Sequence, residues 1–396
     1  MRKFKNVRRN KIIDNKTVKR TFLGDARKIV VGVGLGLVGP VVAPSITAAQ
    51  ETGDENRTLI HGLVKDLKDK DQNKRWRAAA YLGQAAFRGT DISSAVPALK
   101  EALKDDMAVA WRASAALVFH YSKNGNWTEV KKLLKSKNTH AMYGASSGIA
   151  DIANKGMDIS QVVPDLISIV NQGRSNSKLA ASALTFHYVN NRQWSEVDKL
   201  LKEESKEIKK GALDALKEAP LKGVDVKPLV PTLEGLLNDR SVRDKVVSVL
   251  TFHYALHQQY DKIDGWMNSK NMWIKKSVLN ILETAASELG LKITGILPSV
   301  AKVLGDEKIV LRLNAAEVFF NVAEKGRDIS AGILALEKAL DDENGYVKSL
   351  SAGALSYHYL YTGNYEGFRK LLFHKDDMVR ETAIRTSERY GEKMGQ

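Results

Sequence analysis

Apolar residues recur at helical spacing along the chain and fall into short segments that turns separate. Val96, Leu99 and Leu103 occupy positions i, i+3 and i+7, which lie on one face of an α-helix. The same spacing returns 67 residues later, from Val163, and the alternation of apolar and polar residues that marks a strand is absent. The pattern therefore predicts an all-α chain.

These helical segments belong to a repeat with a period of 67 residues. Each copy contains a motif such as "GTDISSAVPALKEAL", which begins at Gly89. Its glycine suits the left-handed end of one helix, Asp and Ser suit the start of the next, and proline is tolerated in a first turn. A fifth copy begins early, at Gly326, and has Leu334 where proline is expected. The four prolines that keep the period are Pro97, Pro164, Pro231 and Pro298.

A second motif follows the first and contains a His-Tyr pair, as in "ALVFHYSKNGNW". We expect a repeated corner in which histidine satisfies a carbonyl group or caps a helix end, and an aromatic residue starts the next short helix. The alternative is a row of histidines that contacts a ligand. A metal ion shared between copies is disfavoured, because copies lie about 20 Å apart and metal–nitrogen bonds are about 2 Å long. The corner residues are His120, His187, His253 and His358, with aromatic residues seven positions later that begin with Trp127 and Trp194.

The two motifs together predict about ten helical hairpins that stack and share one core, because a single hairpin cannot bury its own apolar face. At about 10 Å per hairpin, the solenoid would be about 90–100 Å long. The expected hairpins span 57–88, 93–123, 126–155, 160–190, 194–221, 228–257, 260–289, 295–325, 331–362 and 365–394.

Acidic turns inside the hairpins are followed by a basic residue that opens the second helix, as in Asp306 with Arg312. With the two-helix period and the prolines, this pattern resembles the HEAT repeat over residues 57–394. The resemblance implies an armadillo-like α-solenoid, a superhelix in which such residues brace adjacent repeats. The other pairs are Asp106 with Arg112, Asp239 with Arg243, Asp342 with Lys348, and Asp377 with Arg380.

The HEAT motif indicates the architecture and says almost nothing about function. Our leading hypothesis is a non-enzymatic scaffold, an exported α-solenoid whose concave face, formed mostly by second-helix side chains, binds a protein or peptide partner. The motif does not name that partner. Some HEAT-like proteins are alkylpurine DNA glycosylases, so a nucleic-acid-binding protein is the main alternative. Others attach or isomerise bilin chromophores, which gives a third class that nothing specific in the chain supports.

Candidate chemistry in the repeat region is sparse. Basic and aromatic residues cluster at 74–77 (KRWR) and 273–276 (WIKK), which suits either contact with phosphates and bases or an exposed helix start with one anchored aromatic side chain. Carboxylate pairs such as Asp105 and Asp106 suit helix caps. No Ser–His–Asp set, phosphate loop or metal-ligand spacing stands out, so we predict no catalytic residue, cofactor or metal ion.

Composition narrows the function further. The chain has 396 residues and a formal net charge of +15, but residues 1–49 carry 11 Lys and Arg against 2 Asp, which leaves the rest at only +6. A strongly basic face for nucleic acid is therefore not required. Cysteine is absent, which excludes disulfides, thiol catalysis and zinc–thiolate sites.

The N-terminal 50 residues have the pattern of a targeting segment. A basic head at 1–28 precedes an uncharged stretch at 29–50 that ends in small residues. The segment "VKRTFLG" resembles a twin-arginine export motif through Lys19, Arg20, Phe22 and Leu23, although a lysine replaces the first arginine. We expect export to the periplasm, the cell envelope or the medium, with cleavage after Ala49.

Two other interpretations of the apolar stretch remain. Residues 29–49 are about long enough to anchor the chain in a membrane, and a cytoplasmic chain with a disordered basic arm is also compatible. Gly34, Gly36 and Gly39 have the spacing of a dinucleotide-binding loop, and Asp54 fits its ribose contact. That interpretation is disfavoured, because Pro40 follows at once where a long helix should begin and no strand–helix alternation follows.

The export interpretation predicts a mature chain that begins at Gln50 and lies outside the cytoplasm. N-terminal sequencing of the native protein, combined with cell fractionation, measures both properties. An intact Met1 in the cytosolic fraction would contradict export and would favour the nucleic-acid alternative.

Overall fold

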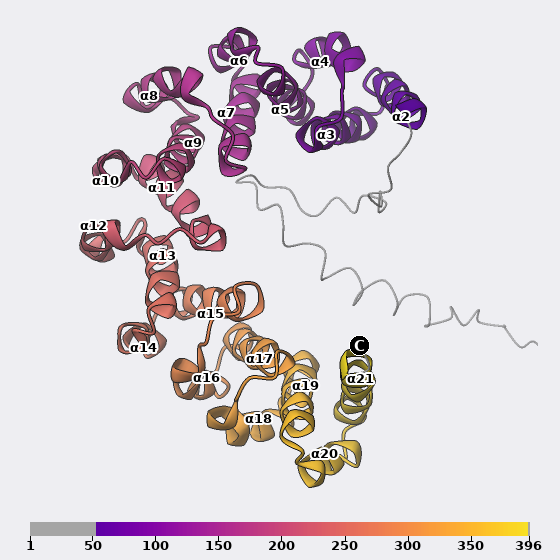
Figure 1. Cartoon of the computed structure of the whole chain (residues 1–396), viewed down its shortest axis with the longest axis vertical. Coiled ribbons are helices and arrows are strands. Elements are labelled where there is room, and N and C mark those ends of the chain that lie inside the picture. The colour runs from indigo at the N-terminus through magenta and orange to yellow at the C-terminus, as the bar shows by residue number, and fades with distance from the viewer. Residues whose placement is uncertain (1–52, 395–396) are drawn as a thin grey trace, which may run out of the picture.

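The structure is a computed structural model that describes residues 53–394, and these residues form an all-helical arc without strands (Figure 1). The prediction of ten stacked helical hairpins in an α-solenoid is confirmed, and the fold is HEAT-like.

The export residues Lys19, Arg20, Phe22, Leu23 and Ala49 lie outside the described residues. Within 53–394, none of the helices combines the length and the apolar character that a membrane crossing requires.

Each hairpin pairs a first helix on the outer side of the arc with a second helix on the inner side (Figure 1). The outer helices are α2 (Gly53–Asp66), α4 (Val96–Ala102), α6 (Trp127–Leu134), α8 (Val163–Asn171), α10 (Trp194–Lys202), α12 (Val230–Gly235), α14 (Tyr260–Met267), α16 (Leu297–Val303), α18 (Ile333–Ala339) and α20 (Tyr365–Leu372). The inner helices are α3 (Gln72–Arg88), α5 (Met107–Lys123), α7 (Thr139–Asn154), α9 (Ser177–Asn190), α11 (Lys206–Glu218), α13 (Arg243–Leu256), α15 (Met272–Ser287), α17 (Ile309–Glu324), α19 (Gly345–Thr362) and α21 (Asp377–Met394).

The long and short connections between hairpins follow from local sequence. The four repeat prolines each occupy the second position of an outer helix (α4, α8, α12 and α16), where the missing N–H has no partner to lose. A 3-10 turn precedes each of these helices, and Gly89 ends α3 in the left-handed conformation with φ 97°. Where the His-Tyr motif occurs instead, the chain turns directly into Trp127 or Trp194, the first residues of α6 and α10.

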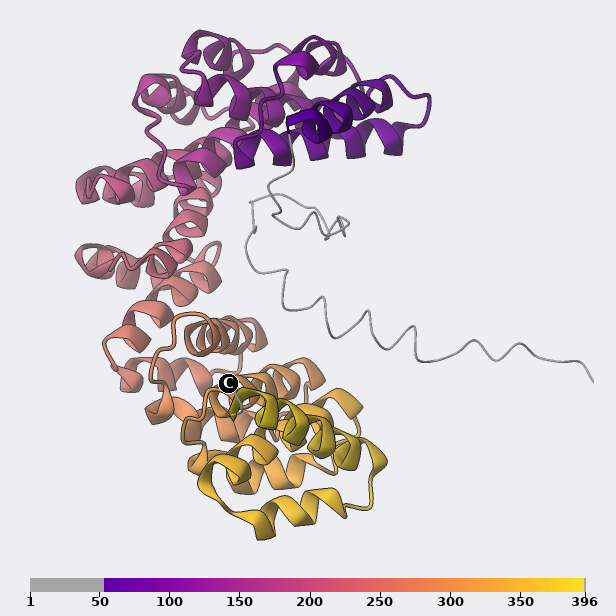
Figure 2. The same cartoon turned by 45° about the vertical axis from the view of Figure 1, so that its right-hand side comes forward.

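One apolar core runs through the stack, from Ile60 in the first hairpin to Ala383 in the last. Its members come from both helices of every hairpin, so each hairpin is closed by its neighbours. The view in Figure 2 shows the first and last hairpins facing each other across the open side of the arc.

Ion pairs brace successive hairpins at the turns between outer and inner helices. In each pair a basic residue of one inner helix contacts an aspartate in the turn of the next hairpin, and Arg312 does so through two bonds to Asp342, of 2.7 and 3.1 Å. The other pairs are Arg75 with Asp105, Lys209 with Asp239, Lys275 with Asp306, and Lys348 with Asp376. This is the bracing that the HEAT resemblance implies.

Three basic residues that the resemblance assigned to the bracing of adjacent repeats make other contacts instead. Arg243 donates to the Leu237 carbonyl in its own hairpin at 2.6 Å. Arg380 pairs with Asp377 in its own turn. Arg112 faces the inner layer, as described below.

Inner helices approach so closely that glycine is required at two crossings. A Cβ atom on Gly144 of α7 would lie 2.2 Å from the Trp111 carbonyl oxygen, and one on Gly211 of α11 would lie 2.1 Å from the Lys178 carbonyl oxygen. Because these neighbours are backbone atoms, they can yield only if the helices move apart.

Gly211→Ala should therefore destabilise the fold by about 1–3 kcal/mol through overpacking. Gly62→Ala is the matched control, because Gly62 lies in α2 with no atom within 4 Å of the added methyl group; it should gain about 0.5–1 kcal/mol from helix propensity. Urea unfolding followed by circular dichroism measures both changes. Equal midpoints for the two variants would show that the α9–α11 contact is not tight.

Candidate functional site

The inner helices carry half-buried carboxylates whose pKa burial raises. Burial raises the pKa of Glu218 on α11 against the opposing charges of Lys217 and Lys222. Burial also raises the pKa of Glu283 on α15, and the nearby charge of Glu317 adds to that rise. These carboxylates are held where water solvates them poorly, so a cation that reached them would gain more than it does at an exposed site.

Asp151 on α7 is the extreme case in this row. Burial raises its pKa to about 7, and the Arg112 guanidinium offsets only part of that rise. Burial also lowers the pKa of Arg112, whose guanidinium lies 5.8 Å from the centre of the Trp76 ring. A tryptophan, an arginine and a carboxylate from three successive inner helices therefore lie close together.

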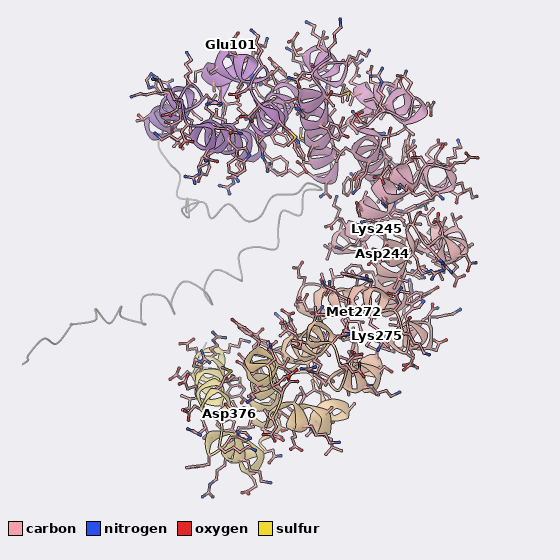
Figure 3. The ribbon with its side chains drawn as sticks, turned by 180° about the vertical axis from the view of Figure 1, so that it is seen from behind. Glu101, Asp244, Lys245, Met272, Lys275 and Asp376 are labelled. Atoms are coloured by element: carbon pink, nitrogen blue, oxygen red, sulfur yellow. The ribbon has the colours of Figure 1, made fainter. Side chains whose placement is uncertain are left out.

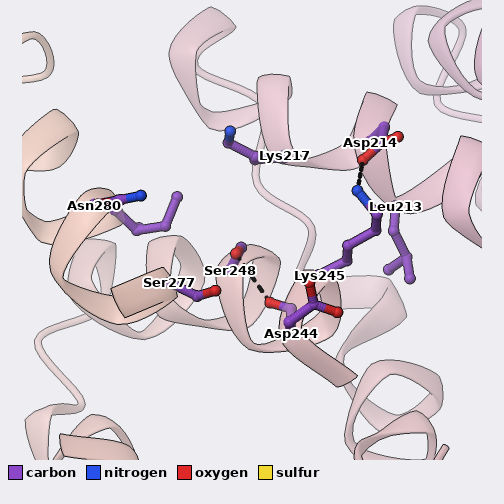
Figure 4. A pocket seen from close by; sticks show the side chains of 9 residues that line it. Leu213, Asp214, Lys217, Asp244, Lys245, Ser248, Ser277 and Asn280 are labelled. Atoms are coloured by element: carbon purple, nitrogen blue, oxygen red, sulfur yellow. Dashed lines mark hydrogen bonds and ion pairs between the residues drawn. The ribbon is translucent and has the colours of Figure 1, made fainter. Parts of the chain in front are cut away.

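A polar depression of about 210 Å³ lies in the middle of the arc, across α11, α13 and α15 (Figure 4). Asp214 pairs there with Lys178 at 3.0 Å and with Lys245. Asp244 and Lys245 mark its position in Figure 3. The remaining polar lining comes from Lys217, Asp244, Ser248, Ser277 and Asn280. Alternating charges and hydroxyl groups suit polar main-chain and side-chain groups of a partner better than an apolar ligand.

Lysines at the ends of inner helices reach back across two hairpins. Lys155 donates to the Phe87 carbonyl at 2.7 Å and lies 3.5 Å from the centre of that ring. Lys393 repeats this arrangement on the Glu324 carbonyl at 3.2 Å, and Lys222 repeats it on Asn154. A positive charge at a helix C-terminus is favourable. We call Lys155, Lys222 and Lys393 the clamp lysines, because such a reach requires the arc to be curved.

The four histidines of the His-Tyr motif lie in separate corners, each beside the aspartate of its own Gly-x-Asp motif. Burial lowers the pKa of His120, and the charge of Asp91 partly offsets this change. Burial likewise lowers the pKa of His187 and of His358, and the charges of Asp158 and Asp328 partly offset it. Asn124 donates to the His120 carbonyl at 2.8 Å, and Asn191 does the same to His187. Trp127 and Trp194 are half-buried against the core. This geometry is that of a structural corner, and no two of the four histidines share a site.

The third corner differs and was not anticipated from the sequence. Asp225 accepts a hydrogen bond from Nδ1 of His253 at 2.9 Å and another from Nε2 of His257 at 2.9 Å. Burial alone would raise the pKa of Asp225, but the bonds from the two imidazoles outweigh it and lower the pKa. The signal was present as two histidines four positions apart in "HYALH", after a Gly-x-Asp motif in the same hairpin.

The two basic and aromatic clusters are mostly engaged in internal contacts. In the first, Lys74 pairs with Asp69, Arg75 pairs with Asp105, and Trp76 is half-buried against the core. In the second, Lys275 pairs with Asp306, while Trp273 keeps 61% of its surface exposed. The paired cations favour helix starts over a phosphate-binding surface.

No protein-family model matches the chain, and no curated protein sequence matches it. Among solved structures, an engineered protein from a structural genomics consortium is 21% identical with a TM-score of 0.42, over 83% of this chain and 98% of that one. A mutant of Kap121p is 13% identical with a TM-score of 0.46, over 87% of this chain and 42% of that one. Importin beta is 14% identical with a TM-score of 0.49, over 83% of this chain and 50% of importin beta. The chain thus spans half the length of importin beta and less of Kap121p.

The raised pKa of Asp151 predicts a specific pH dependence of stability. Because the folded chain holds this proton more tightly than the unfolded chain, the free energy of unfolding falls as pH rises between about 4 and 7. Asp151→Asn removes the titration, so the variant should lose less stability than the wild type between about pH 5 and pH 8. Thermal unfolding at both pH values measures the difference.

Ser147→Ala is the control for that experiment, since it lies one turn earlier on α7 and changes no titratable group. It should follow the wild-type pH profile. If Asp151→Asn followed that profile as well, the carboxyl group would be ionised in the fold at neutral pH.

Proposed function

We propose that the protein is a non-enzymatic scaffold that binds a protein or peptide partner along the inner face of its arc. The observation that carries the proposal is the row of half-buried carboxylates, Asp151, Glu218 and Glu283, on inner helices. A partner segment with lysine or arginine side chains would add positive charge where the nearby Arg112, Lys217 and Lys222 offset only part of the effect of burial. The polar depression beside Asp214 supports the same interpretation, since it offers donors and acceptors to an extended chain.

The same charges disfavour a nucleic-acid partner on this face. A phosphate backbone needs unpaired cations, whereas Lys178 and Lys245 pair with Asp214. Export remains part of the proposal, because the basic head and apolar stretch of residues 1–50 support it. An exported chain would also be separated from cellular DNA.

A charge reversal on the inner face should abolish partner binding. Glu218→Lys combined with Glu283→Lys should weaken the complex by about 2 kcal/mol or more, because it places like charges against a basic partner. Glu101→Lys is the matched control, since Glu101 is exposed on the outer helix α4 (Figure 3). Fluorescence anisotropy with a labelled lysine- and arginine-rich peptide, an acidic peptide of equal length and a DNA duplex measures the affinities.

The proposal expects the wild type and Glu101→Lys to bind the basic peptide equally and the inner-face variant to lose it. Tighter binding to the duplex with a steep salt dependence would instead assign the face to nucleic acid. Equal binding of the basic peptide by all three proteins would place the partner elsewhere on the arc.

A further inference from the structure

The histidine corner recurs four times, and three copies hold their aspartate in the same way. A serine two positions after the aspartate donates its hydroxyl to the carboxylate, at 2.5 Å from Ser93 to Asp91 and at 2.5 Å from Ser160 to Asp158. Ser330 does the same for Asp328. In these three corners the aspartate carboxylate therefore accepts a hydrogen bond from the serine hydroxyl group.

The remaining corner departs from this pattern at two positions. Lys227 stands where the other copies have serine, so only its backbone N–H contacts Asp225, at 3.0 Å. His257 stands where two of the copies have asparagine, Asn124 and Asn191. Lys227 and His257 are 30 residues apart in sequence, and both affect the Asp225 carboxylate. Lys227 leaves this carboxylate without a hydroxyl donor, and His257 brings a second imidazole to it.

We propose that Asp225, His253 and His257 form a binding site for a divalent transition-metal ion, with zinc as the best match. One imidazole nitrogen from each histidine and one carboxylate oxygen of Asp225 all lie within 4.8 Å of one another. Two imidazoles and one carboxylate are a donor set that Zn²⁺ takes. His253 lies in the last turn of α13, and His257, four positions later, is the residue that caps the C-terminus of that helix.

Metal binding would replace the two present hydrogen bonds to Asp225. Ligand bonds of about 2.0–2.2 Å place the ligand atoms about 3–3.5 Å apart, close to the 2.9 Å that now separates each imidazole nitrogen from the carboxylate. Each imidazole needs only to carry its proton on the other ring nitrogen, which a neutral histidine does by exchanging tautomers.

Burial suits a site that is rigid on one side and open on the other. The His253 side chain is only 6% exposed, whereas Asp225 is 33% and His257 is 37% exposed. An ion can therefore enter from solvent and keep water in its remaining coordination positions. Because Asp225 precedes α12, while His253 lies in the last turn of α13 and His257 directly follows that helix, the ion would join the two ends of one hairpin.

The test is calorimetric titration of the full-length, EDTA-treated protein with zinc chloride. We expect one zinc ion per chain. His257→Gln and Asp225→Asn should each lower the affinity by more than about tenfold, since even outer-shell partners of a metal contribute on that scale. His187→Gln is the matched control in an equivalent corner and should keep wild-type affinity.

A gain-of-site variant keeps the test decisive if Asp225→Asn fails to fold. Ser160→Lys combined with Asn191→His gives the second corner both departures and should raise the stoichiometry to two zinc ions. Failure of the wild type to bind zinc would overturn the proposal and leave a hydrogen-bonded trio alone. Equal affinity in the wild type and His257→Gln would also overturn it.

Discussion

A single helical hairpin of this chain cannot bury its apolar face, so each inner helix between α3 and α21 packs against the inner helices on both sides. Glycines at the α5–α7 and α9–α11 crossings let backbones meet where a methyl group would strike a carbonyl oxygen. The inner helices pack against one another more closely than the outer helices do, and the stack bends toward the inner side (Figure 1). The clamp lysines then bind across two hairpins, which is possible only on the inner side of a curved array.

The electrostatic character of the concave face follows from this packing. Crowded inner helices remove water from side chains that would be solvated on an isolated helix, and carboxylates such as Asp151 and Glu283 hold their protons more tightly as a result. The braces at the opposite ends of the hairpins are different in kind, since Arg312 and its Asp342 partner satisfy each other. The arc therefore has mutually paired charges at its turns, whereas burial raises the pKa of the carboxylates inside even where Arg112 or Lys217 lies nearby. A partner on the concave face would meet this second set.

Sequence reasoning reached the architecture because the features that define it are local. Helical spacing, the prolines in first turns and the His-Tyr corners each act within one hairpin, and their period fixes how many hairpins there are. It did not find the Arg112–Asp151 region, the clamp lysines or the Asp225 trio, because each joins residues about 30–70 positions apart in sequence. The first two depend on how neighbouring hairpins stack, and the third depends on how the two ends of one hairpin meet. The brace partners show the same limit. The sequence shows which turns are acidic and which residues are basic, but it does not show that Arg112 and Arg243 make other contacts than those expected of them.

The most direct measurement of the central claim is the distance between the two ends of the arc. The chain has no cysteine, so spin labels can be placed at exposed Asn73 and Glu388 after cysteine substitution of each. Pulsed electron resonance should give one narrow distance distribution that lengthens and broadens when the three clamp lysines are replaced by methionine. A distribution that is unchanged by those replacements would contradict the account, because the curvature would then not depend on contacts across two hairpins.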